Sequence, residues 1–137
     1  MNFSFPIRVY YDDTDAGGVV YYANYLKYLE RCRTEWLRAA GFDQSALLAE
    51  HGLAFMVRRV EADYRRPAVL DDLLHVSLRV EKFGGARIVF AQLVARERPG
   101  GPESLVEARV EIACVNIKSG KPMPIPEWMR ERLGAPR

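Results

Sequence analysis

The segment YYDDTDAGGVVYYANYLKYLERCRTEWLRAAG, residues 10–41, changes its hydrophobic period part-way along. The residues that lead into it alternate between apolar and polar, a pattern typical of a half-buried strand. Beyond Gly17 and Gly18, apolar residues recur every three or four positions, which predicts an amphipathic helix. Three carboxylates stand where one pattern gives way to the other: Asp12, Asp13 and Asp15. The segment therefore predicts a strand end, an acidic glycine-containing loop and a long helix in succession.

The two predicted elements extend in both directions from the paired glycines. The strand covers Phe3–Asp12, with apolar side chains on one side up to Tyr11. The helix runs from Tyr22 to Ala40, and Gly41 supplies the residue that commonly ends a helix. The apolar face of this helix contains Tyr22, Tyr25, Leu29, Cys32, Trp36 and Ala40.

The rest of the chain is predicted to be mostly strands joined by turns. A short helix over Gln44–His51, closed by Gly52, precedes them, and a short C-terminal helix follows them. The FGGA sequence predicts a tight hairpin, because glycine adopts a positive φ at little cost. The four predicted strands are Ala54–Tyr64, Leu73–Phe83, Ala86–Arg98 and Ser104–Ile117, and most are expected to pair as hairpins.

This order of elements predicts an α+β fold with one domain over residues 1–137. A five-stranded antiparallel sheet must bury its apolar face, and the long helix is the available partner. We therefore expect the sheet to wrap around a central helix. The fourth strand is apolar on both faces, with Ile88 and Phe90 on one side and Val89 and Leu93 on the other. We expect the chain to form a homodimer or a dimer of dimers, that is, a homotetramer.

Composition excludes several classes of function. The formal net charge is +2 and basic residues are interspersed with acidic ones, which argues against a nucleic-acid-binding surface. No apolar run is long enough to span a membrane and no signal peptide is evident, so a cytoplasmic protein is expected. Cys32 and Cys114 are predicted to be buried thiols, and with only His51 and His75 besides, no metal site is predicted.

The acidic loop is suited to acyl chemistry. The first N–H groups of a helix lack intrahelical partners and favour negative charge, so they could stabilise the oxyanion of an ester or thioester intermediate. Asp15 would approach the same carbon as a general base or a nucleophile. Gly17 and Gly18 would let the backbone approach the substrate closely. The local residues also fit a plain alternative, in which Asp and Thr cap the helix and the glycines form a hinge.

Three stretches together resemble the hotdog-fold acyl-CoA thioesterases. They are YYDDTDAGGVVYYANYLKYLERCRTEWLR, FMVRRVEADYRRPAVLDDLLHV and EARVEIACVNIKSGKPMPIPE. The pattern D-x-D-x-x-G-V-V-Y-x-x-N-Y is most similar to the Tol-Pal-associated (YbgC-type) branch, related to 4-hydroxybenzoyl-CoA thioesterase. The resemblance covers nearly the whole chain and implies a hotdog fold.

The resemblance also implies roles for individual residues. The catalytic aspartate of the family falls on Asp15, whereas Asp13 is expected to support the loop. The backbone oxyanion donor falls on Tyr22, where typical members of the branch carry histidine, as in YHANY, and this chain has YYANY. Gly18 is expected to line the substrate site. The basic residues expected to contact the phosphates of CoA are Lys82, Arg87, Lys118 and Lys121.

We therefore predict an acyl-CoA thioesterase that releases a free acid and CoA without a metal or redox cofactor. The acyl group is expected to lie in a tunnel at a subunit interface. The main alternative is a non-catalytic hotdog module that binds acyl-CoA or acyl carrier protein in the same tunnel. A hotdog dehydratase normally needs an Asp/His pair, and no histidine lies near Asp15 in the sequence. A scaffold for envelope machinery is suggested only by the name of the family.

Overall fold

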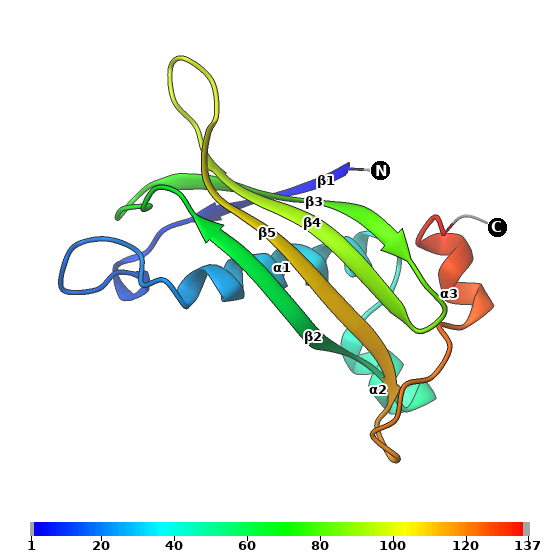
Figure 1. Cartoon of the computed structure of the whole chain (residues 1–137). Coiled ribbons are helices and arrows are strands. Elements are labelled where there is room, and N and C mark those ends of the chain that lie inside the picture. Colours follow the sequence, from blue (N-terminus) through cyan, green and yellow to red (C-terminus); the bar gives the residue numbers. More distant parts are fainter. Residues whose placement is uncertain (1, 136–137) are drawn as a thin grey trace.

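The computed structural model describes residues 2–135, which contain a single antiparallel sheet of five strands (Figure 1). The spatial order of the strands is β1-β3-β4-β5-β2, so β1 and β2 form the two edges. Their bounds are β1 Asn2–Arg8, β2 Leu53–Tyr64, β3 Leu73–Phe83, β4 Arg87–Arg96 and β5 Glu103–Asn116.

The helix α1 (Asn24–Ala39) lies along one face of this sheet and contacts β1, β3 and β4. Its buried side chains meet the apolar face of the strands, and Trp36 packs edge-on against Phe90 of β4. The largest fully buried side chains of this core include Tyr28, Leu29, Leu78 and Phe90. The predicted α+β fold with a sheet around a long helix is confirmed.

Two short helices complete the described structure. The helix α2 (Gln44–His51) has the predicted bounds, because Asp43 caps its first turn and Gly52 ends it in the left-handed conformation. The helix α3 (Glu127–Arg132) packs beside the β3–β4 hairpin, where the Arg130 guanidinium donates to the Gly84 carbonyl.

The predicted first strand is too long. β1 ends at Arg8, and the chain turns through a short 3₁₀ helix at Tyr11–Asp13. Tyr11, which was expected on the apolar side of the strand, is 81% exposed. The alternation of apolar and polar residues continues past Arg8, so it predicts a longer strand. The turn that ends the strand is stabilised by hydrogen bonds of Asp13 and Thr14, which leave this alternation unchanged.

The prediction that most of these strands pair as hairpins is confirmed, because β3–β4 and β4–β5 are hairpins, whereas β2 pairs with β5 rather than with its neighbour in sequence. The reason given for the FGGA turn needs correction. The FGGA hairpin is present, with the Gly84 N–H donating to the Arg87 carbonyl, but neither of its glycines has a positive φ. Gly84 is instead explained by close packing, because an added Cβ would lie 3.3 Å from Arg87 Cγ.

Both cysteines are buried and free, as predicted. Burial raises the pKa of the Cys32 thiol to about 12 and that of Cys114 to about 11, so both stay protonated near neutral pH. Among residues 2–135, no group of three or more His, Cys, Asp and Glu side chains is placed to hold a metal ion. No helix in the described part of the chain is long and apolar enough to cross a membrane.

Candidate active site

Asp15 opens a tight turn in the loop between β1 and α1. Its backbone N–H donates to the Val19 carbonyl (2.9 Å), and its carbonyl accepts from the Gly18 N–H (3.0 Å). Gly18 has a φ of +79°, which a residue with a Cβ adopts only with strain. The Asp15 carboxylate accepts from the Gly17 N–H (2.8 Å) and is exposed to solvent. The turn thus holds the carboxylate in a defined position without burying it.

Asp13 holds the base of the same loop. One carboxylate oxygen accepts from the Tyr10 N–H and the other from the Asn24 side-chain amide, each at 2.9 Å. Burial alone would raise the pKa of Asp13, but these hydrogen bonds outweigh it and leave the pKa below its usual value. The carboxylate therefore ties Tyr10, two residues after β1, to the first residue of α1, in agreement with the supporting role expected for it.

A second set of contacts joins this loop to the segment after β2. The Val20 N–H donates to the Ala68 carbonyl (2.9 Å), and the Ala68 N–H donates to the Tyr25 hydroxyl (2.9 Å). Arg96, which is buried, anchors the same segment through the Pro67 carbonyl and Asp72. Residues 65–72 are consequently held against the acidic loop and the start of α1.

Tyr22 lies two residues before the start of α1, which begins at Asn24 rather than at Tyr22 as predicted. Its carbonyl accepts from the Tyr25 N–H, whereas its own N–H has no hydrogen-bond acceptor among residues 2–135. The Tyr22 side chain is 62% exposed, so it is not part of the buried helix face. The free N–H at the start of the helix is the feature that an oxyanion would use.

An aromatic pocket of about 220 Å³ adjoins Tyr22. The Tyr64 ring meets the Tyr22 ring edge-on, with centroids 6.3 Å apart, and lies 5.7 Å from the Tyr25 ring. Two arginines at the end of β2 contribute the polar part of the wall. The lining residues are Val20, Tyr22, Tyr25, Tyr64, Arg65, Arg66 and Pro67. Such a wall suits an apolar or aromatic group with an anionic neighbour.

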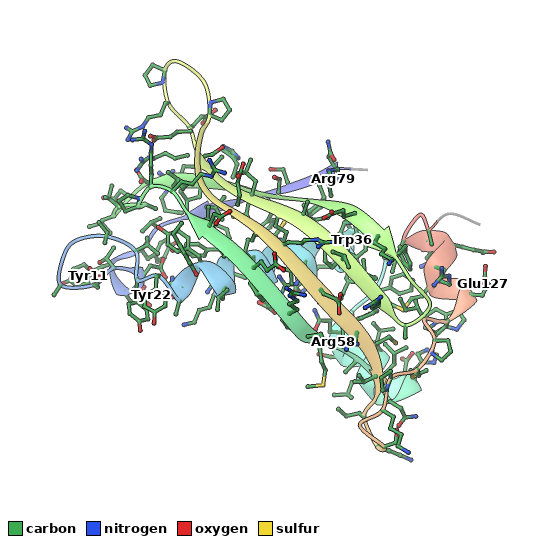
Figure 2. The ribbon with its side chains drawn as sticks, in the orientation of Figure 1. Tyr11, Tyr22, Trp36, Arg58, Arg79 and Glu127 are labelled. Atoms are coloured by element: carbon green, nitrogen blue, oxygen red, sulfur yellow. The ribbon has the colours of Figure 1, made fainter. Side chains whose placement is uncertain are left out.

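The acidic loop and the predicted basic residues lie at opposite ends of the sheet (Figure 1). Lys82 and Arg87 flank the β3–β4 turn, and Lys118 and Lys121 lie in the exposed loop after β5. Arg87 is 3.5 Å from Glu111. Figure 2 shows Tyr11 and Tyr22 at one end of the molecule and Glu127 of α3, the helix that packs beside the β3–β4 turn, at the other. One chain therefore carries Asp15, Gly18 and Tyr22 on one loop at one end of the sheet and the four basic residues at the other end.

The chain is similar to known thioesterase-like proteins. A family model described as the thioesterase-like superfamily matches residues 9–133. The chain belongs to this superfamily. Acyl-CoA thioesterase YbgC of Haemophilus influenzae is 49% identical over 128 residues, which cover 93% of this chain and 91% of that protein. Acyl-CoA thioester hydrolase YbgC of Escherichia coli O6:H1 is 43% identical over 125 residues, covering 91% of this chain and 90% of that protein.

Solved structures of thioesterases have the same fold. A probable thioesterase from Bartonella henselae superimposes with a TM-score of 0.85 at 40% identity, covering 92% of this chain and all of the other. The structure of a 4-hydroxybenzoyl CoA thioesterase mutant complexed with 4-hydroxybenzoyl CoA has a TM-score of 0.89 at 19% identity, covering 96% of this chain and 98% of that one. At that identity the likeness concerns the fold alone. The predicted hotdog-type thioesterase fold is confirmed.

Sequence reasoning missed the arginines of the aromatic pocket. RRPA was interpreted only as the end of a strand, and Tyr25 and Tyr64 were not connected with each other. The pocket forms because residues 65–68 fold back onto α1, a contact between segments 43 residues apart. The only signal in the sequence was the pair Arg65 and Arg66, which directly follows an aromatic residue at the end of a strand.

Proposed function

We propose that this chain is an acyl-CoA thioesterase, which uses water to release a free acid and CoA. The observation that carries the proposal is that one short loop carries both an exposed Asp15 carboxylate, held by the Gly17 N–H, and the free N–H of Tyr22. The naming of both YbgC relatives as acyl-CoA thioester-cleaving enzymes supports it. A cytoplasmic location is part of the proposal, and the two free thiols fit a reducing compartment.

The chemistry follows from the placement of charge. The thioester carbonyl oxygen would accept a hydrogen bond from the Tyr22 N–H, which stabilises the negative charge that develops there. Asp15 would take a proton from water as the water oxygen attacks the acyl carbon, or would attack that carbon itself before water releases the acid. In both cases the carbon–sulfur bond breaks, and the sulfur leaves as the thiolate of CoA and is then protonated.

The acyl group would lie in the aromatic pocket next to Tyr22. The Tyr25 and Tyr64 rings supply apolar contact area, and both adjoin the residue that carries the donor N–H. Arg65 and Arg66 stand at the exposed side of the pocket, where they pair with Glu107 and Glu103. These arginines are placed to meet an anionic part of the substrate.

The separation of the basic residues is explained if the active unit is a homodimer. β2 is a long edge strand whose Met56, Val57 and Val60 side chains are exposed. An edge of this kind is a template for pairing with another strand. Antiparallel pairing with the β2 of a second copy would place the start of that strand beside Tyr64. The loop with Lys118 and Lys121 is attached near the start of β2, where the Ile117 N–H donates to Gly52, so the partner's loop would approach the pocket.

Thiol release from acyl-CoA distinguishes this function from that of a binding module. A panel of short-chain, long-chain and aromatic acyl-CoAs is assayed for thiol release and for thermal stabilisation of the protein. A thioesterase releases thiol from at least one of them, and the Tyr22→Phe variant keeps most of the activity because the donor belongs to the backbone. Thermal stabilisation by acyl-CoA without thiol release from any member of the panel would contradict the proposal and identify a binding module.

A further inference from the structure

Asp13 holds both ends of the short stretch Tyr21–Asn24, which contains Tyr22. Its backbone carbonyl accepts from the Tyr21 N–H (3.1 Å), and its carboxylate accepts from the Asn24 side-chain amide (2.9 Å). The Asn24 N–H closes the stretch by donating to the Tyr21 carbonyl (2.8 Å). Both ends of the stretch are therefore fixed to the acidic loop through one residue.

The N–H groups between these two ends are left for a ligand. Among residues 2–135, neither the Tyr22 N–H nor the Ala23 N–H has a hydrogen-bond acceptor. Ala23 is also the cap residue of α1, and it offers the first turn no side-chain acceptor. A serine, threonine or aspartate at this position would place an oxygen at the helix start, where it would compete with an oxyanion. The start of α1 is thus open, and a residue other than the cap must fix it.

Asn24 provides this attachment. Asparagine is a poorer helix former than alanine, because its side chain readily bonds to nearby groups outside the helix. Here the side chain reaches back to the Asp13 carboxylate, and the bond is partly shielded from water. The amide therefore anchors the first residue of α1 without occupying either of the free N–H groups.

The Asp13 carboxylate is a lasting acceptor for this amide. Burial alone would raise the pKa of Asp13, but hydrogen bonds from Tyr10 and Asn24 and the charge of Arg31 lower it below its usual value. The carboxylate consequently stays ionised in neutral and mildly acidic solution. It can accept from Asn24 throughout that range.

We propose that Asn24 is a positioning residue, which through Asp13 directs the free N–H of Tyr22 toward the carbonyl oxygen of the thioester. This inference rests on the proposed thioesterase function and deepens it. If Asn24 moved away from Asp13, the peptide that carries the Tyr22 N–H would be free to rotate. Asp15 lies on the same loop just beyond Asp13, so the one anchor also sets the donor relative to the base or nucleophile. Asn24 acts through Tyr22 and needs no contact with the substrate.

The kinetics of thiol release by Asn24→Ala provide the first test, with the acyl-CoA that the wild type cleaves fastest. Alanine is the better helix former, so the substitution removes the amide without weakening α1. We expect kcat to fall by about tenfold to a hundredfold, because a small misplacement of a group that acts in the transition state has an effect of this size. KM should stay within about twofold of the wild-type value, as expected when an interaction made only in the transition state is lost.

Thr34→Ala is the matched control for this variant. It removes side-chain hydrogen bonds further along the same helix, in which Thr34 donates to Glu30 and accepts from Gln44. Both kcat and KM should remain at their wild-type values, since Thr34 has no connection to the acidic loop. Circular dichroism and urea denaturation of both variants check that they are folded under the assay conditions.

Asn24→Asp gives a second readout, because it keeps the shape of the side chain and replaces the donor by a carboxylate. Two like charges this close raise the pKa of the pair, so they face one another unprotonated at about pH 8 and share a proton in mild acid. The shared proton restores a hydrogen bond to Asp13. The loss of kcat relative to the wild type should be at least about threefold smaller at about pH 5.5 than at about pH 8. Asn24→Ala should lose the same factor at both values.

The remaining charged and titratable groups near this position are common to the wild type and both variants. They interact with Asp13 or line the same pocket: Arg31 and Tyr28 of α1, Arg8 of β1, Tyr10 and Asp12. Each rate is divided by the wild-type rate at the same pH, so titration of these groups and of Asp15 cancels from the comparison. The pH dependence of the ratio then reports on the carboxyl group introduced at position 24.

The possible results separate this inference from the proposed function. Wild-type kcat in Asn24→Ala, or a change confined to KM, would overturn the inference and leave the thioesterase function standing. A loss in Asn24→Asp that is the same at both pH values would overturn it as well. Absence of thiol release from the wild type would overturn the proposed function and this inference together. If Asn24→Ala is not folded, the comparison of Asn24→Asp at the two pH values decides.

Discussion

The Ala68 N–H donates to the Tyr25 hydroxyl oxygen, 2.9 Å away, and both residues are buried. This single bond fastens the segment after β2 to the first turn of α1, next to Tyr22. It therefore controls the wall of the aromatic pocket as well as the position of the acidic loop, which is joined to Ala68 through Val20.

Replacing Tyr25 by phenylalanine should destabilise the protein. The Ala68 N–H would remain buried without an acceptor, at a cost of about 1–3 kcal/mol in the free energy of unfolding. Tyr28→Phe is the matched control, because the Tyr28 hydroxyl is buried near Asp13 and Asn24 without a hydrogen bond of normal geometry. That variant should be as stable as the wild type or more so. Urea denaturation of both measures the difference, and equal losses would refute the role given to Tyr25.

Asp13 should make the protein sensitive to acid. Its folded-state pKa is lowered, so it contributes stability that is fully present above the unfolded value near 3.8 and is lost as the pH falls through the lower folded value. The Asp13→Asn variant should lack this contribution. We expect the difference in unfolding free energy between wild type and variant to be constant at neutral pH and to shrink below about pH 4. A difference that does not change with pH would contradict the account.

Arg96 should matter far more than the neighbouring Arg98. Arg96→Ala leaves Asp72 and Glu103 without their buried cation and removes the hydrogen bond to the Pro67 carbonyl. We expect it to lower the free energy of unfolding by about 3 kcal/mol. Arg98 also contacts Glu103, but its side chain is largely exposed, so Arg98→Ala should cost about 1 kcal/mol or less. Chemical denaturation compares the two, and similar losses would mean that the Arg96 cluster does not anchor residues 65–72.

Gly18→Ala should disturb the turn that presents Asp15. No atom lies within 4 Å of an added Cβ, so the cost arises from the φ of +79° and should be about 1–2 kcal/mol. Gly85→Ala is the control, since its surroundings are equally open and its φ is not positive. Thermal unfolding should separate the two variants, with thiol release falling only in Gly18→Ala. Identical behaviour would show that the backbone conformation at Gly18 is dispensable.

The elements that the sequence predicts well are those with local signals. The bounds of α2 follow from Asp43 and Gly52 at its ends, and β3 follows from an uninterrupted alternation between turns. The predicted end of β1 was wrong, because the 3₁₀ turn that follows the strand depends on a hydrogen bond of Asp13, which leaves no trace in the pattern of apolar residues. The β2–β5 pairing brings distant segments together, which no local pattern encodes.

The residues of the candidate site likewise fall into those with a local signal in the sequence and those without one. Asp15, Gly18 and Tyr22 lie on one loop, so a motif in the sequence sufficed to propose them. Arg65 and Arg66 enter the pocket through the long-range contact between Ala68 and Tyr25, and they were missed. Lys82, Arg87, Lys118 and Lys121 remain predictions, because their role depends on a second chain.

The most direct test of the central claim is thiol release by Asp15→Asn, with Asp12→Asn as the matched control on the same loop. The substitution keeps the shape of the side chain and its hydrogen bond from the Gly17 N–H. It removes the negative charge with which Asp15 would either activate water or attack the acyl carbon itself. We predict that kcat falls by about a hundredfold or more for Asp15→Asn, the range expected for loss of the general base or nucleophile, and stays near the wild-type value for Asp12→Asn. Equal activity of Asp15→Asn and wild type would show that Asp15 only shapes the loop.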